Sequence, residues 1–297
     1  MENHHHFYDI ALIGNYTKDT IVSKSGMRVV DGGAVNYGAH AAVKLGVKTA
    51  AFTRLSKSDI HVVKELQQLG VHAFSYVTPH STCLRLEYPT ENVDQRTVYL
   101  TSSAGSFTKE QVAYISAQAI VIGTSVRDEM PLKVIRELAA KKSLLCADVQ
   151  GFLRINENGK LVYRPWQEKA EILRHIDVLK TDAVEAEILT GEKNIRNAAQ
   201  RLAKMGPQEI VLTHKNGLLV YAHRQFYETN FYSKALIGRS GRGDTCIASY
   251  VAKRLSSPPG QAIIWAAALT SLKMEVEGPF RGDLHEIEEL IRMKYRI

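Results

Sequence analysis

The chain has 297 residues, of which 45% are hydrophobic and 23% are charged, so a globular protein with a substantial core is expected. No apolar run approaches the roughly 18 residues that a membrane-spanning helix needs, and the N-terminus lacks the pattern of a secretory leader. The three cysteines are widely spaced, which argues against a disulfide framework. Together these features favour a cytoplasmic protein without a membrane partner. The net charge is +7, but lysine and arginine are dispersed, which favours small anionic ligands over nucleic acid.

Strand and helix patterns alternate along most of the chain. The first half contains predicted strands at 10–13 and 49–53 and predicted helices at 34–45 and 60–69. The second half contains strands at 119–122, 144–149, 178–180 and 210–213, helices at 131–141, 168–175 and 195–205, and a hairpin at 218–222 and 225–231. Helices at 247–255, at 261–276 and from residue 284 follow. The alternation predicts an α/β fold with a largely parallel sheet, and no linker pattern divides residues 1–297 into separate domains.

Two segments interrupt this alternation with hairpin patterns. One lies at 20–30 and turns at Ser25 and Gly26, and the other lies at 82–101 and turns around 89–92. Strands that interrupt a βα pattern often form a flap, and a flap over an active site excludes water. We therefore expect a small β lid made by residues of about 16–31 and 82–102.

The most informative motif lies at 238–246 (GRSGRGDTC), directly before the helix pattern at 247–255. Gly241 and Gly243 have no Cβ, so the backbone can approach a ligand closely. The unpaired N–H groups at a helix start suit a phosphate. Asp244 would repel a phosphate, and its presence is explained if it accepts a proton from an attacking hydroxyl. The segment therefore indicates a phosphoryl-transfer site, although Asp244 taken alone could equally be a helix cap.

A second pair of carboxylates follows the predicted strand at 178–180. Asp182 and Glu185 are three residues apart, so they share one face of a helix. At the C-terminal edge of a strand they could order a hydrated Mg²⁺, which prefers oxygen ligands. Taken alone, this spacing at a helix start is more often a cap.

Together these segments resemble the two signature regions of the ribokinase/PfkB family of small-molecule kinases. The family patterns are G-A-G-D, here residues 241–244, and N-x-x-E followed by T-G, here residues 182–191. Residues 31–34 (DGGA) resemble the substrate-side glycine pair of the family, and the three motifs stand in the family's order over essentially the whole chain. The resemblance implies a ribokinase-like three-layer α/β fold with a mostly parallel central sheet and a small β lid, with ATP and Mg²⁺ as cofactors.

Within that family, the bacterial inositol kinases provide the most similar segments. The likeness covers residues 238–246, 147–152 (ADVQGF) and 161–166 (LVYRPW). It makes myo-inositol the leading acceptor among sugars and cyclitols.

The resemblance also implies roles for individual residues. Asp244 would be the general base, and the N–H groups of Gly241, Arg242 and Gly243 would form an anion hole for the transferring phosphoryl group. Asp182 and Glu185 would organise Mg²⁺, through water. The implied substrate contacts are Asn15, Asp19, Gly32, Gly33, Asn36 and Gln150. The implied nucleotide contacts are Asp182, Thr213, Lys215, Gly217 and Arg239, with the helix around 267–271 flanking the adenine.

Several positions depart from the family patterns. Asp182 replaces the usual Asn, and Arg242 replaces Ala in the anion hole. The guanidinium groups of Arg242 and the nearby Arg239 could contact phosphate or point to solvent. Tyr37 stands where the helix usually carries Asn, and Lys215 stands where a Gly is common.

The function predicted from the sequence is an ATP-dependent kinase that phosphorylates a hydroxyl of a sugar or cyclitol, as a monomer or homodimer. One alternative is a nucleoside kinase that holds the base against Phe52, Tyr76 or Tyr99; another is a nucleotide-binding protein without catalysis. A dinucleotide oxidoreductase is disfavoured because the first strand is followed by residues 14–17 (GNYT) in place of G-x-G-x-x-G.

Overall fold

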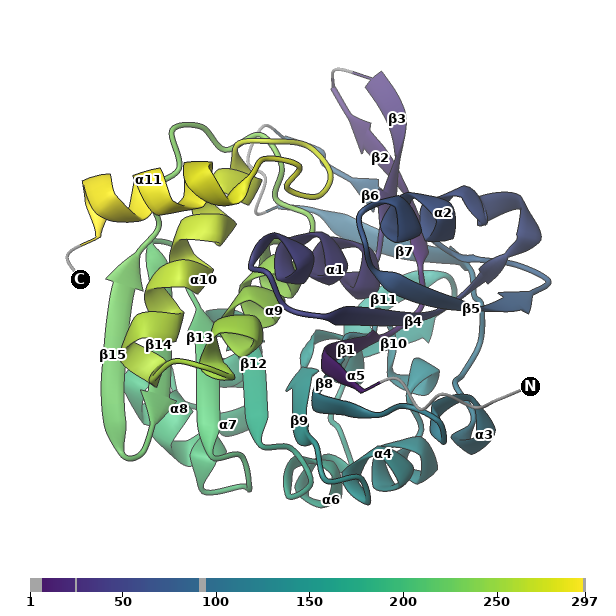
Figure 1. The fold of residues 1–297 in the computed structure, drawn as a ribbon. Coiled ribbons are helices and arrows are strands. Elements are labelled where there is room, and N and C mark those ends of the chain that lie inside the picture. Colours follow the sequence, from purple (N-terminus) through teal and green to yellow (C-terminus); the bar gives the residue numbers. More distant parts are fainter. Residues whose placement is uncertain (1–6, 25, 91–94, 296–297) are drawn as a thin grey trace.

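The computed structural model describes residues 7–24, 26–90 and 95–295. In this part of the chain a nine-stranded sheet lies beside a six-stranded sheet (Figure 1). The order of the large sheet is β15-β14-β13-β12-β9-β8-β1-β4-β5, with parallel neighbours from β13 to β5 and antiparallel pairing of β14 and β15. Its strands are β1 Tyr8–Ile13, β4 Thr49–Ser56, β5 His72–Thr78, β8 Ala117–Ile122, β9 Leu144–Asp148, β12 Val178–Asp182, β13 Glu209–Thr213, β14 Gly217–Ala222 and β15 Gln225–Asn230.

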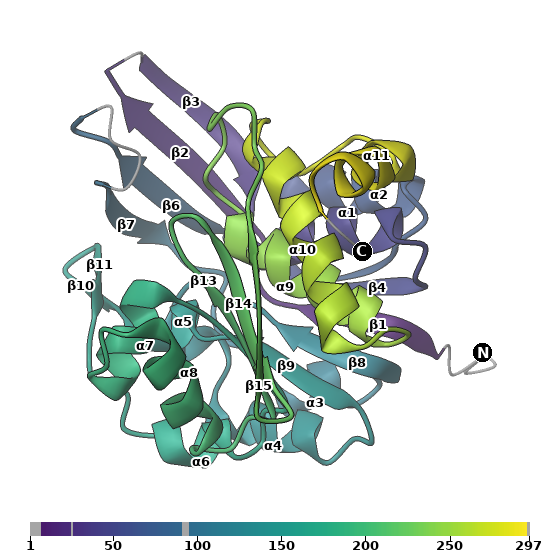
Figure 2. The ribbon, with the colours of Figure 1, turned by 90° about the vertical axis from the view of Figure 1, so that its left-hand side faces the viewer.

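Helices cover both faces of the large sheet (Figure 2). The helices on one face are α1 Ala34–Lys44, α2 His61–Gln68, α9 Arg242–Arg254, α10 Pro259–Met274 and α11 Leu284–Lys294. The helices on the other face are α3 Lys109–Val112, α4 Leu132–Ala139, α5 Gln150–Leu153, α6 Lys169–Leu173, α7 Ala183–Thr190 and α8 Ile195–Ala203. Successive side chains of a strand point to opposite faces: Leu12 and Val211 join the first buried cluster, and Ile13 and Leu212 the second. The three-layer α/β prediction is confirmed.

The second sheet is the lid. Its order is β10-β11-β7-β6-β2-β3, and its strands are β2 Thr17–Ser23, β3 Gly26–Gly32, β6 Thr82–Glu87, β7 Thr97–Ser102, β10 Arg154–Glu157 and β11 Lys160–Tyr163. Both predicted hairpins are present, as the antiparallel pairs β2–β3 and β6–β7. Of their predicted turns, Ser25 and residues 91–92 lie outside the described residues.

A third hairpin, β10–β11, extends the lid and was not predicted. It turns at Asn158 and Gly159, which have φ angles of 51° and 89°, and the side chain of Asn156 accepts a 2.8 Å hydrogen bond from the Gly159 N–H. Asn-Gly with positive φ at both positions is the preferred two-residue hairpin turn. The hairpin continues the lid through pairing of β11 with β7, so the lid is larger than the sequence indicated.

Two further elements differ from expectation. β5 was not predicted, because its sequence HAFSYVT mixes polar and apolar residues without a buried face as clear as that of β4. α9 begins at Arg242, several residues before the predicted start, because Gly241 caps it in the left-handed conformation with φ of 78°. The glycine motif and Asp244 therefore form the first turn of the helix. Among the described residues, no helix is both long and apolar enough to cross a membrane.

Candidate active site

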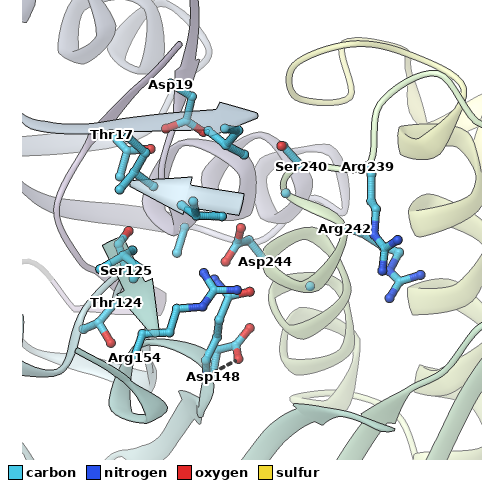
Figure 3. Close-up of a pocket in the computed structure, with 18 of the residues that line it drawn as sticks. Thr17, Asp19, Thr124, Ser125, Asp148, Arg154, Arg239, Ser240, Arg242 and Asp244 are labelled. Carbon is cyan, nitrogen blue, oxygen red and sulfur yellow. Dashed lines mark hydrogen bonds between the residues drawn. The ribbon is translucent and has the colours of Figure 1, made fainter. Parts of the chain in front are cut away.

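A cavity of about 440 Å³ lies where the C-terminal edge of the large sheet meets the lid (Figure 3). The end of β9 contributes Asp148, the middle of β12 contributes Lys180, and the first turn of α9 contributes Asp244. The lid contributes apolar side chains, which are Leu84, Leu86, Val98, Leu161 and Val162. The cavity therefore has a charged floor, and its lid side combines these apolar side chains with charged ones such as Asp19 and Arg154.

Asp244 occupies the centre of this floor. Its side chain points into the cavity from the first turn of α9 (Figure 3), a turn closed by a 2.9 Å hydrogen bond from the Thr245 N–H to the Gly241 carbonyl. Burial first, and then the nearby Asp148 carboxylate, raise the pKa of Asp244 to about 7, against the opposing charge of Lys180. A carboxylate whose pKa lies near neutral pH is suited to accept a proton at physiological pH.

The two glycines of the motif are packed so tightly that neither tolerates a side chain. A Cβ at Gly241 would lie 2.2 Å from the Tyr37 ring, and a Cβ at Gly243 would lie 2.4 Å from Nζ of Lys180. The Arg242 N–H donates to the Arg239 carbonyl at 3.3 Å, so this N–H already has an acceptor within the loop. The anion hole remains a prediction. Because the Arg242 N–H is already bonded, the backbone N–H groups that follow Arg242 are the better candidates to bind the anion.

Arg239 and Arg242 lie side by side at one end of the cavity (Figure 3). The pKa of each guanidinium is lowered, first by burial; for Arg239 the neighbouring Arg242 lowers it further. Both are partly buried and line the cavity, so of the two readings left open by the sequence, the one with phosphate contacts is favoured over the one with solvent.

Asp19 lies across the cavity from these arginines, on lid strand β2. It is 6% exposed, and burial raises its pKa to about 6, opposed by a hydrogen bond from Thr17 and by the charge of Arg96. Within the described part of the chain its Oδ1 atom has no hydrogen-bond partner. A buried, unsatisfied acceptor that lines a cavity is a place for a ligand hydroxyl.

The other predicted substrate residues divide into two groups. Gly33 and Gln150 line the cavity with Asp19. Asn15, Gly32 and Asn36 are not among the lining residues: Asn15 donates to the Gly105 carbonyl at 2.9 Å, Asn36 donates to the Asp31 carbonyl at 3.1 Å, and a Cβ at Gly32 would lie 2.6 Å from Oδ2 of Asp19. Gly32 therefore packs against Asp19, and direct contact of any of the three with a substrate stays a prediction.

Asp182 and Glu185 form a reciprocal cap at the start of α7. The Asp182 side chain accepts from the Glu185 N–H and the Glu185 side chain accepts from the Asp182 N–H, each at 2.8 Å. Glu185 is fully buried, burial raises its pKa to about 7, and within the described residues its Oε1 atom has no partner. No group of three or more acidic, histidine or cysteine side chains suited to a metal occurs in the described chain, so a cation held here would keep mostly water or phosphate ligands.

The predicted nucleotide residues are spread out. Asp182 and Thr213 line the cavity, whereas Lys215 and Gly217 do not. A Cβ at Gly217 would lie 2.1 Å from the Thr229 carbonyl, so strand β15 explains this glycine. The helix residues predicted to flank adenine are buried: Ala267 and Ser271 have 0% exposure.

The family model of the pfkB family carbohydrate kinases matches residues 7–281. The chain belongs to this family. It is therefore a phosphotransferase with an alcohol group as acceptor. No curated protein sequence is significantly similar to it.

Several solved structures are similar to this pfkB-family kinase. A pyrophosphate-dependent kinase in the ribokinase family, in a sulfate complex, is 36% identical with a TM-score of 0.88 over 94% of this chain and 99% of that chain. One complexed with a pyrophosphate analogue and myo-inositol is 35% identical, with a TM-score of 0.87 over 94% and 99% of the two chains. Arabidopsis thaliana ribokinase, complexed with ribose and ATP, shares the fold at 17% identity, with a TM-score of 0.76 over 97% and 99%.

The site of this kinase contains charged residues that sequence reasoning missed. Lys180 pairs with Asp148 on the cavity floor, and Arg154 enters the cavity from the unpredicted hairpin. Lys180 stands two residues before the predicted metal pair, at the end of a predicted strand, a position that could have marked it. Phe52, Tyr76 and Tyr99, proposed for a nucleoside base, are not among the lining residues. The Phe52 ring stacks on Phe74 with the ring centres 4.8 Å apart.

Proposed function

We propose that this kinase phosphorylates a hydroxyl of myo-inositol with pyrophosphate as the phosphoryl donor and Asp244 as the general base. The observation that carries the proposal is one cavity with a carboxylate end, formed by Asp19, and a guanidinium end, formed by Arg239 and Arg242, with Asp244 between them (Figure 3). An acceptor rich in hydroxyls suits the first end, and an anionic donor suits the second.

The acceptor end supports a cyclitol. The unsatisfied Oδ1 atom of Asp19 accepts a hydroxyl, and Gln150 provides a further polar group on the same cavity. The apolar lid wall suits the C–H face of a ring. A similar pyrophosphate-dependent kinase, 35% identical, has been solved with myo-inositol and a pyrophosphate analogue.

The donor end supports pyrophosphate over ATP, the donor that the sequence predicted. Each of the two adjacent guanidiniums can donate two parallel hydrogen bonds to phosphate oxygens. Such contacts help to bind pyrophosphate, which has no adenosine group to add binding contacts. The face of α10 predicted to contact adenine is covered by the chain itself: Ser271 accepts from the Tyr232 N–H at 2.9 Å and lies 3.3 Å from the Tyr295 hydroxyl. The rings of Tyr232 and Tyr295 also pack edge to face, at 5.0 Å.

Asp182 lines the cavity, and together with the buried Glu185, whose Oε1 has no partner among the described residues, it would hold a hydrated Mg²⁺, which prefers oxygen ligands. Such an ion would neutralise charge on the phosphoryl oxygens. The residues of the chain perform the rest: Asp244 takes the proton from the attacking hydroxyl, and the N–H groups at the start of α9 stabilise the transferring group. The acceptor oxygen bonds to phosphorus as the bond to the leaving phosphate breaks, so the products are an inositol phosphate and orthophosphate.

The test is to incubate the purified protein with Mg²⁺, with pyrophosphate or ATP as donor, and with myo-inositol, ribose or a nucleoside as acceptor. ³¹P NMR of the products identifies both the phosphorylated acceptor and the donor used. We expect an inositol phosphate with pyrophosphate, and a rate about 10² to 10⁴ lower in Asp244→Asn, since a positioned base contributes that much. Turnover with ATP alone would refute the donor, and turnover of ribose or a nucleoside alone would refute the acceptor.

A further inference from the structure

A buried ion pair lies directly beneath the catalytic helix turn. Lys180, in the middle of β12, is the register partner of Asp148, the last residue of the parallel strand β9. Their Nζ and Oδ2 atoms are 2.8 Å apart, and the two side chains are 4% and 5% exposed. Both residues line the cavity, so the pair belongs to the site and not only to the sheet.

The pair touches the residue that precedes Asp244. A Cβ built on Gly243 would lie 2.4 Å from Nζ of Lys180 and 3.2 Å from Oδ2 of Asp148. The backbone of Gly243 therefore rests on both members of the pair. Two opposite charges are thus fixed close together, beside the helix turn that carries Asp244.

We propose that Lys180 and Asp148 are positioning residues for Asp244, which act on its carboxylate with opposite charge from beneath the first turn of α9. This inference rests on the proposed role of Asp244 as the base. Stability alone is a weak reason for such a pair, because a buried ion pair can often be replaced by neutral groups of similar volume without loss of stability.

The electrostatic surroundings of Asp244 support this division. Asp148 raises the pKa of Asp244 and Lys180 lowers it, on top of the larger increase caused by burial. The other titratable or charged groups that interact with Asp244 are Asp19 on β2, Tyr37 on α1, Arg154 on β10 and Lys273 on α10. Of these groups, all within the described residues, only Lys180 and Asp148 form an ion pair with each other. Because both charges act on Asp244, a substitution of either one changes the charge balance at the base.

The test is the pH dependence of kcat/KM for the wild type and for Asp148→Asn, Lys180→Met and the double variant, with myo-inositol and whichever donor supports turnover. The base is active when deprotonated, so the rate rises with pH through its pKa. Asp148→Asn removes the negative charge and moves the rising part of the pH profile (its acid limb) to lower pH. Lys180→Met removes the positive charge and moves this limb to higher pH, and each shift is about one pH unit. If Lys180→Met does not fold, the double variant is compared with Asp148→Asn, and the limb again moves to higher pH.

Two kinds of failure are distinguishable. If Asp244→Asn retains nearly full turnover, Asp244 is not the base and the proposed function fails. If Asp244→Asn is inactive but the two single variants shift the limb in the same direction, or not at all, the pair has a purely structural role and this inference is overturned. Opposite shifts cannot arise from a common loss of stability.

Discussion

At the scale of single residues, the backbone of the α9 start depends on the Tyr37 ring. Gly241 needs φ of 78°, and its Cα faces the ring so closely that a Cβ would overlap it at 2.2 Å. The same ring lies 5.3 Å from Nζ of Lys273, which donates at 2.9 Å to the Gly238 carbonyl. Tyr37 and Lys273 thus hold the two ends of the loop that carries Arg239, which explains why an aromatic residue can stand where the family usually has Asn.

Gly241→Ala is expected to lower kcat at least about 10-fold, since its Cβ must displace Tyr37 or the first turn of α9, and small displacements at a reacting centre cost about that much or more. Gly46→Ala is the matched control, with nearly the same φ of 79° but nothing within 4 Å of the added Cβ. Gly46→Ala should lose about 1 kcal/mol of stability from the positive φ, and Gly241→Ala should lose more because its Cβ also overlaps the Tyr37 ring. Equal activity of the two variants in steady-state assays would contradict the role of the Tyr37 contact.

A second residue-scale prediction concerns the acceptor. Asp19→Asn should raise KM for myo-inositol about 10-fold, because the amide loses one acceptor and the charge that strengthens hydrogen bonds from substrate hydroxyls. KM for the donor should change little, since Asp19 lies at the other end of the cavity from the arginines. Asp128→Asn, an exposed carboxylate, is the control. An increase in KM for the donor alone would place Asp19 in the wrong subsite.

At the scale of elements, the β10–β11 hairpin brings a cation toward Asp244. Arg154 begins β10 opposite Tyr163 on β11, and its guanidinium lies 5.7 Å from the centre of that ring. Arg154 points toward Asp244 in the cavity (Figure 3), and its charge lowers the pKa of Asp244. The hairpin therefore carries a positive charge to the side of the cavity that holds Asp244, where we propose that the phosphoryl group is transferred.

Arg154→Met should lower kcat/KM about 10²-fold, because a cation that faces the developing charge of the phosphoryl group is removed. Arg154→Lys keeps the positive charge but loses the planar guanidinium that can donate two parallel hydrogen bonds, so it should recover part of the lost kcat/KM. The matched control is Arg164→Met: this arginine follows the same hairpin but pairs with Glu157, and its side chain is 50% exposed. If Arg154→Met and Arg164→Met had the same small effect on initial rates, the charge of Arg154 would not contribute to catalysis and the hairpin would serve only to cover the cavity.

The sequence predicted elements with strong local signals and missed features that depend on contacts between distant segments. The motif of Gly241 and Asp244 was found because its residue types carry chemistry at short spacing. The pairing of Lys180 with Asp148 could not be found, since it arises only when β9 and β12 become neighbours. The hairpin at Asn158 did have a local signal in its Asn-Gly turn, but its strands are only four residues long. Ser271 is covered by Tyr295, which is distant in the sequence. The sequence near α10 therefore contained no signal against an adenine site there.

At the scale of the whole molecule, the enzyme buries several carboxylates, and removing their charges from water lowers the stability of the folded state. Burial raises the pKa of Asp244 and of Glu185 to about 7, and that of Asp19 to about 6. A raised pKa in the folded state means that the folded state binds protons more tightly than the unfolded chain. These groups therefore oppose folding increasingly as the pH rises from about 4 to about 7. The site is a place where stability is lower than the fold alone would allow, in keeping with the trade-off between stability and activity.

It follows that Asp244→Asn should inactivate the enzyme and stabilise it. The amide has no charge to desolvate, so its advantage over the wild type is absent near pH 4, grows as the pH rises to about 7, and stays constant above that. We expect Tm of the ligand-free variant to exceed that of the wild type by at least about 2–4 °C at pH 8, which corresponds to about 1 kcal/mol in a protein of this size, and by less at pH 5. Asp128→Asn, at an exposed position, should show no such difference in the same calorimetric scans. A variant that is less stable than the wild type at pH 8 would mean that the carboxylate of Asp244 stabilises the folded chain through contacts that outweigh its burial.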